Sequence, residues 1–175
     1  ALFYGLAGMF LFGAMFGFIS SSQQVFVDIY GLGPWFPVAF AVMASTMAVA
    51  SFMNSRIVRR FGMRRLSHGA ILIYIAMSVV LLAISLTGHL GFWLFAPIVL
   101  VIQVAFGLAA SNMNSLSMEP LGAVAGTAAS VFGFIQTVGG ALLGTYIGQN
   151  FDGTVTPIAL GYVSMGTSVL ICVLI

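Results

Sequence analysis

The segment NSRIVRRFGMRRL (Asn54–Leu66) holds all five basic residues of the chain and connects two long stretches without charged side chains. These stretches are Pro34–Ser55 and Leu66–Met118. A helix that spans a bilayer needs about 20 predominantly apolar residues, and an arginine at its centre costs about 2.5–3.5 kcal/mol or more. The sequence therefore predicts that the arginines lie in water, in a loop over residues 56–65 between two membrane-spanning helices.

Composition extends this interpretation to the whole chain of 175 residues, which is 61% hydrophobic and 5% charged. Soluble domains are about 25% charged. The few charged side chains cannot cover the surface of a soluble domain, so the chain is expected to be an integral membrane protein. The arginines form one short segment rather than a basic face, which excludes a nucleic-acid-binding domain.

The charge-free stretches divide into six expected transmembrane helices. Leu66–Met118 is too long for one crossing and contains a turn-like cluster at Thr87–Gly91. The runs are continuous and longer than the alternating segments of about 10 residues found in membrane barrels, which favours an all-α protein. The expected helices lie near residues 1–26, 34–55, 66–87, 92–114, 121–149 and 155–175.

Orientation follows from the arginines, because short loops rich in arginine face the cytoplasm. Six crossings then leave both ends of the chain cytoplasmic, with the connection near 115–120 on the same side and those near 28–33, 88–91 and 150–154 outside. Ala1 and Ile175 both lie inside apolar runs. We therefore expect the chain to be a piece of a longer protein of the cell (inner) membrane.

A faint internal repeat links the first and fourth expected helices. FGFISSS (Phe16–Ser22) resembles FGLAASN (Phe106–Asn112), 90 residues later. An offset of three helices inverts one copy relative to the other, and such 3+3 inverted repeats build the halves of many transporters.

The carboxylates and histidines needed for catalysis or metal binding do not lie deep within the expected membrane spans. All three carboxylates, Asp28, Glu119 and Asp152, lie at expected helix ends, and His68 and His89 lie near opposite membrane faces. Paired-carboxylate catalysis, a nucleophilic triad and a metal cluster therefore lack their residues. We expect no enzymatic activity, no cofactor and no metal, and a proton-binding site would have to lie on a missing part of the protein.

Neutral polar residues do lie within the expected spans. An unpaired amide in hydrocarbon costs several kcal/mol, so these side chains are expected to face the bundle or a wet cavity. Two interpretations stay open for each of them, hydrogen bonding between helices and binding of a substrate. The candidate substrate-binding residues are Phe16, Ser20, Gln23, Gln24, Gln103 and Gln136.

Glycine is dense in the fifth expected helix, where small residues recur at four-residue spacing. The first set is Gly122, Gly126 and Ser130, and the second is Gly140, Gly144 and Gly148. This spacing allows two helix backbones to approach closely. The neighbour is either another helix of the same bundle or a half of the protein that moves during function.

The arginine segment resembles a known sequence signature. It is similar to the second-half copy of the signature loop of the major facilitator superfamily, in which an acid or amide precedes a Gly-Arg-Arg-like turn. The matching residues here are Asn54, Arg56, Arg59, Arg60, Gly62, Arg64 and Arg65. A plain topology anchor is the alternative interpretation, and Asn54 replaces the acid by an amide.

A second motif narrows the resemblance. EPLGAVAGTAAS (Glu119–Ser130) is similar to a run in the bicyclomycin-resistance drug:proton antiporters. This likeness implies that the chain is the C-terminal six-helix half of a major facilitator, with the first and fourth helices lining the cavity. It implies that the second and fifth helices face the N-terminal half, with Gly140, Gly144 and Gly148 at that interface.

The function implied by the resemblance is proton-coupled efflux of small organic molecules or drugs by alternating access. The partners would be the substrate, protons, the lipid bilayer and the N-terminal half. Two alternatives remain, a non-transporting six-helix membrane assembly and a channel, although no motif for an ion filter is present.

Overall fold

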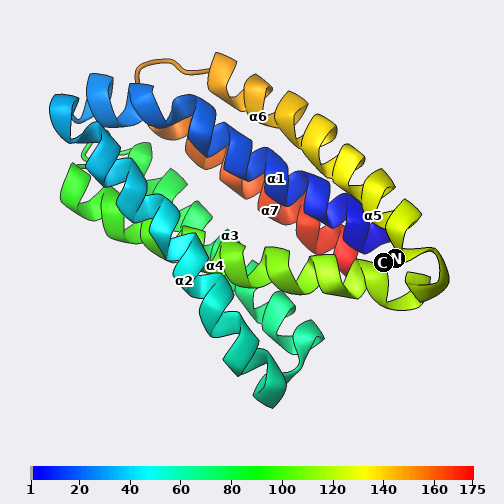
Figure 1. Cartoon of the computed structure of the whole chain (residues 1–175). Coiled ribbons are helices and arrows are strands. Elements are labelled where there is room, and N and C mark those ends of the chain that lie inside the picture. Colours follow the sequence, from blue (N-terminus) through cyan, green and yellow to red (C-terminus); the bar gives the residue numbers. More distant parts are fainter. Residues whose placement is uncertain (1) are drawn as a thin grey trace.

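The computed structural model describes residues 2–175, and every regular element in that range is a helix. The long helices are α1 (Leu2–Gln23), α2 (Phe36–Phe61), α3 (Met63–Ser85), α4 (Phe92–Met118), α5 (Ala125–Phe134), α6 (Gly140–Gln149) and α7 (Thr156–Leu174). Shorter π-helical segments follow α1 (Gln24–Ile29) and join α5 to α6 (Ile135–Gly139), and 3-10 turns precede α2 (Gly33–Trp35) and α5 (Glu119–Val124). Figure 1 shows these elements as one bundle.

Five continuous helical stretches are long and apolar enough to cross a membrane, and the longest, Phe92–Gln149, has 58 residues. At a rise of 1.5 Å per residue such a stretch would extend about 87 Å, far more than a bilayer core of about 30 Å. The chain instead reverses direction after α4, so that α5 and α6 run back along the bundle (Figure 1). Leu121, with φ −112° and ψ 20°, leaves the helical region at this reversal. The prediction of an all-α membrane protein is confirmed.

The arginine segment is not the ten-residue loop that the sequence predicts. α2 continues to Phe61 and α3 begins at Met63, so Gly62 alone interrupts the helices. Arginine is a good helix former, and its long side chain reaches water from a helix end. Gly62 has φ +80°, a conformation that side chains with a Cβ rarely adopt, and this allows the sharp turn.

Helix packing has the symmetry of an inverted repeat. α1 packs on α6, and the equivalent pair α4 and α2 pack together. α3 packs on α4, as α7 packs on α1, while α1–α4 and α3–α7 are the two pairs that the symmetry maps onto themselves. Exchanging the first three transmembrane segments with the last three therefore leaves the pattern of neighbours unchanged.

Two glycines 90 residues apart make the repeat visible at the level of residues. A Cβ on Gly17 of α1 would lie 3.0 Å from the Ile147 side chain of α6, and one on Gly107 of α4 would lie 3.0 Å from Ala50 of α2. Each glycine lets its helix approach the equivalent neighbour closely. The faint sequence match at these positions therefore has a packing cause.

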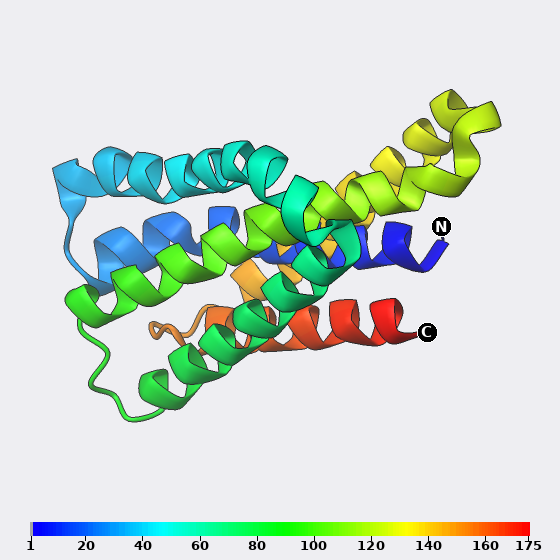
Figure 2. The ribbon, with the colours of Figure 1, turned by 90° about the horizontal axis from the view of Figure 1, so that it is seen from below.

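The two ends of the chain lie at the same end of the bundle, near the turn between α4 and α5 (Figures 1 and 2). The α1–α2, α3–α4 and α6–α7 connections lie at the opposite end. At that end the Tyr30 hydroxyl donates a hydrogen bond to the Leu90 carbonyl over 3.2 Å, which ties two connections together. Partial burial there raises the pKa of Tyr30 to about 12.

Candidate functional site

α1 and α4 form the floor of the candidate site. α2 packs on α4 from one side and α6 packs on α1 from the other. α2 and the α5–α6 segment therefore form the two side walls of this face. Two pockets lie on this floor. One is lined by α1, α2 and α4, and the other by α1, α4 and the π-helical segment that joins α5 to α6.

The first pocket has a volume of about 490 Å³ and contains Gln103. Its other walls are mainly apolar and include Phe18 of α1 and Phe40 of α2, whose rings stack with centroids 5.9 Å apart. Gln103 is 4% exposed and is the polar residue that α4 contributes to this pocket. An amide that lines an apolar pocket can donate hydrogen bonds to a ligand and accept them from it.

The second pocket, of about 240 Å³, contains Gln136. Ser111 and Asn114 of α4 line the same pocket, which is therefore the more polar of the two. The Gln136 side chain crosses directly over Gly8 of α1, where a Cβ would come within 2.4 Å of Nε2. Gln136 belongs to the π-helical segment Ile135–Gly139, and such segments often occur at functional sites.

The four other candidates, on α1 and the π-helical segment after it, do not line either pocket. Phe16 packs on Phe12 with ring centroids 6.2 Å apart, and the Ser20 hydroxyl donates to the Phe16 carbonyl over 2.7 Å. Gln23 is exposed near the end of α1. Gln24 lies in the following π-helical segment, and its buried Oε1 has no hydrogen-bond partner in the part of the chain described. The structure thus separates the six predicted residues rather than gathering them into one site.

Gly140, Gly144 and Gly148 pack against α1 inside this bundle. A Cβ on Gly140 would meet Phe12 at 2.7 Å, and one on Gly148 would meet Ser20 at 2.8 Å. The tightest position is Gly144, where a Cβ would lie 2.4 Å from the Phe16 Cβ and 2.7 Å from a backbone nitrogen. Of the two interpretations left open by the sequence, this supports close packing with another helix of the same bundle, because the close approach that the glycines allow is between α6 and α1.

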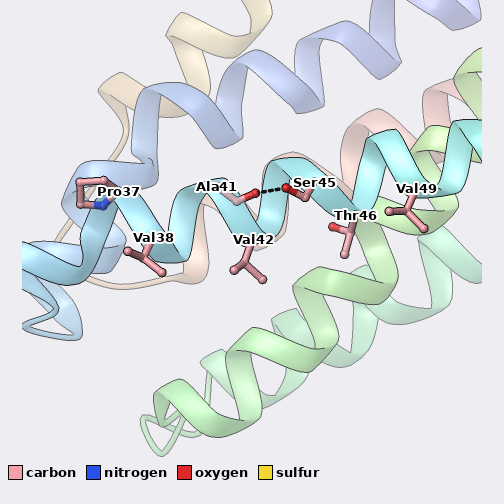
Figure 3. A pocket seen from close by; sticks show the side chains of 7 residues that line it. All are labelled: Pro37, Val38, Ala41, Val42, Ser45, Thr46 and Val49. Carbon is pink, nitrogen blue, oxygen red and sulfur yellow. Dashed lines mark hydrogen bonds between the residues drawn. The ribbon is translucent and has the colours of Figure 1, made fainter.

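The other small residues of the fifth segment have no neighbour. Nothing lies within 4 Å of a Cβ placed on Gly122 or Gly126. α2, the equivalent helix in the repeat, has a similar open face with a shallow groove between Pro37 and Val49 (Figure 3). The Ser45 hydroxyl on this face donates to the Ala41 carbonyl of its own helix, which satisfies it without a partner (Figure 3).

Two buried amides, Asn54 and Asn112, form a reciprocal pair that sequence reasoning did not predict. The Asn112 amide donates to the Asn54 side-chain oxygen over 2.7 Å, and the Asn54 amide donates back over 3.3 Å. One turn away, the hydroxyls of Ser51 and Ser111 lie 3.3 Å apart. The partners are 58 or more residues apart, so no sequence spacing signals the contact. They join α2 to α4 near the arginine segment.

All five arginines are exposed, and two of them contact aromatic rings. The Arg56 guanidinium lies 5.1 Å from the centroid of Phe52, and that of Arg60 lies 5.6 Å from Phe61. Arg64 and Arg65 line a pocket of about 330 Å³ between the α2–α3 turn and the end of α4.

The sequence has matches among known protein families. The model of the Major Facilitator Superfamily matches residues 1–145. The chain belongs to the major facilitator superfamily. It is also similar to a bicyclomycin resistance protein homolog of Haemophilus influenzae, with 32% identity over 98% of this chain and 42% of that protein.

A further relative is an uncharacterized MFS-type transporter, YdgK, of Bacillus subtilis, with 26% identity over 95% of this chain and 41% of that protein. The chain thus spans about two fifths of the length of the curated relatives it matches. No solved structure matches the chain. The resemblance to this superfamily and to the bicyclomycin-resistance proteins is confirmed, and the protein is an integral membrane protein.

Proposed function

We propose that the protein is a proton-coupled antiporter that exports small organic molecules or drugs by alternating access. The observation that carries this proposal is the buried amide of Gln103, which lines a mainly apolar pocket formed by α1, α2 and α4. Membership of a transporter superfamily and the name of the Haemophilus influenzae relative support it.

In this proposal the two pockets bind different parts of the substrate. The larger pocket takes the apolar body of a ligand, and Gln103 supplies one donor and one acceptor to orient it. The smaller pocket adds Ser111, Asn114 and Gln136 as further neutral partners. Phe16, Ser20, Gln23 and Gln24 would then line the path along α1 rather than the binding pocket.

Transport requires a second half that rocks against this one. Because the curated relatives are more than twice as long as the chain, we propose that an N-terminal half packs on the open faces of α2 and α5. No carboxylate lies among the residues that line either pocket on the α1–α4 floor, so the proton site is proposed to lie on that half.

The arginine segment is proposed to face the cytoplasm, with both ends of this chain on the same side of the inner membrane. Asn54, Gly62 and the five arginines would act as the signature connection that holds the inward side. The Asn54–Asn112 pair supports this role, because it links α2, shortly before the arginines, to α4, the helix that carries Gln103.

Reconstitution tests the proposal. The full-length protein is placed in proteoliposomes with an imposed pH gradient and a panel of neutral and cationic drug-like molecules. We expect substrate movement that depends on the gradient and proton movement that depends on the substrate. A protein that binds and moves none of the panel, with or without a gradient, would instead be a non-transporting membrane assembly.

A further inference from the structure

We propose that the pocket formed by Arg64 and Arg65 binds the headgroup of an anionic phospholipid. The transport proposal includes both arginines in the signature connection but assigns no ligand to this pocket, which lies at the end of the bundle rather than on the α1–α4 floor. The proposal rests on the distribution of charge, on the shape and lining of the pocket, and on its depth in the membrane.

The charge at this end of the bundle is strongly positive. All five arginines lie between residues 56 and 65, and that segment contains no carboxylate. Of the three carboxylates in the chain, Asp28 lies in the π-helical segment after α1 and Asp152 lies in the α6–α7 connection, and both elements are at the opposite end of the bundle. Glu119 is the carboxylate at the arginine end. Anionic lipids attract such segments by about 1 kcal/mol per arginine near the surface.

The pocket concentrates this charge in a concave site of about 330 Å³. Arg64 and Arg65 stand beside the sharp turn at Gly62, and Glu119 lines the same pocket at the start of the turn after α4. The lining therefore contains two arginines and one glutamate. Guanidinium groups bind phosphate oxygens through paired hydrogen bonds, so a single phosphodiester matches the two arginines.

The apolar part of the lining favours a lipid over a soluble anion. Phe61, Met63 and Leu116 line the pocket together with the arginines, and Phe61 is 55% exposed. The pocket lies where α2, α3 and α4 end, which is the depth of the lipid headgroups for helices that span the bilayer. A phospholipid would place its phosphate on the arginines and its glycerol and first methylenes on these apolar side chains.

The test measures thermal unfolding of the full-length protein in nanodiscs of phosphatidylcholine with increasing phosphatidylglycerol, phosphatidylethanolamine or, separately, inorganic phosphate in the buffer. We expect phosphatidylglycerol to raise the melting temperature more than the other additions. The double variant R64Q/R65Q should weaken the apparent affinity for phosphatidylglycerol at least about tenfold. R56Q/R59Q removes the same charge outside the pocket and should keep most of the effect.

The variant Glu119→Gln tests whether the group bound in this pocket is an anion or a cation. Removing the carboxylate should strengthen phosphatidylglycerol binding, whereas it would weaken binding of a lipid whose ammonium group contacts Glu119. Three results would overturn the proposal: equal stabilisation by phosphatidylcholine and phosphatidylglycerol, equal loss in the two double variants, or full stabilisation by inorganic phosphate alone. If R64Q/R65Q lowers the melting temperature equally in every lipid, the arginines contact protein instead.

Discussion

For Gln103, the sequence predicts the depth in the membrane, and the structure is needed to infer the role of the side chain. Its position midway along a charge-free run puts it near the bilayer midplane. The choice between hydrogen bonding within the bundle and ligand binding depends on its neighbours. In the structure, the pocket that Gln103 lines is otherwise formed by aromatic, aliphatic and methionine side chains and by Ser51.

We predict that Gln103→Met, which keeps the side-chain length and removes the hydrogen-bonding groups, changes the substrate preference of the proposed transporter. The apparent affinity for substrates that bond the amide should fall by about 1–3 kcal/mol, and the melting temperature should change little. Efflux or binding assays over a substrate panel, with melting measured in parallel, provide the test. A lower melting temperature with an unaltered panel would assign Gln103 to packing.

Gly144 is the residue at which a side chain is least compatible with the bundle. The Cβ of an alanine there would lie 2.4 Å from the Phe16 Cβ and 2.7 Å from the backbone nitrogen of Gly17. Backbone atoms cannot move aside locally, so α6 and α1 would have to separate. We predict that Gly144→Ala destabilises the protein by about 1–3 kcal/mol, measured by thermal unfolding in detergent.

Gly69→Ala is the matched control, because Gly69 is also helical and no atom lies within 4 Å of its added Cβ. Its melting temperature should stay the same or rise slightly, since alanine has the higher helix propensity. Equal stability of the two variants would mean that α6 and α1 are not packed as closely as described.

At the scale of elements, the two equivalent helix contacts of the repeat are held by different forces. α6 and α1 meet through glycines, so their contact depends on close van der Waals packing. α2 and α4 also approach at Gly107, but the end of that contact near the arginines is hydrogen-bonded. Buried hydrogen bonds give α2 and α4 a fixed register there.

A double-mutant cycle on Asn54 and Asn112 measures this contact. Each single alanine variant leaves the other amide buried without its reciprocal partner, which should cost about 1–3 kcal/mol. The double variant should cost less than the sum of the singles, with a coupling of about 0.5–2 kcal/mol in the free energy of unfolding. Strictly additive losses would show that the pair contributes nothing as a pair.

At the scale of the whole molecule, the arrangement of the connections fixes which positions share a membrane face. The chain ends, the α4–α5 turn and the arginine turn belong to one end, and the other three connections belong to the opposite end. By the positive-inside rule we expect the first end to face the cytoplasm.

Cysteine labelling in intact cells checks this orientation. In a Cys172→Ala background, Phe61→Cys and Ser115→Cys should be protected from a membrane-impermeant thiol reagent, and Thr87→Cys should react. All three positions are exposed, so burial does not explain protection. Reaction at Phe61→Cys and protection at Thr87→Cys would invert the topology.

The fold class followed from sequence because it depends on quantities that run along the chain. The length of charge-free stretches predicted membrane-spanning helices, and Gly17 with Gly107 hinted at the repeat. The predicted extent of the arginine loop was wrong, because the prediction ended the helix at residue 55, where the first charged side chain follows. Helix formation over residues 56–61 depends on backbone hydrogen bonds and on helix propensity, and these residues satisfy both, so α2 continues to Phe61.

The sequence by itself determined that this protein lies in a membrane, since hydrocarbon excludes charge wherever it occurs in the chain. Only the tertiary structure decided which residues meet. It divided one row of small residues into a packed part at Gly144 and an open part at Gly126, and it separated Gln103 from Gln136. It also joined Asn54 to Asn112. The rotation of each helix about its axis sets such contacts, and that rotation results from the packing of the whole bundle.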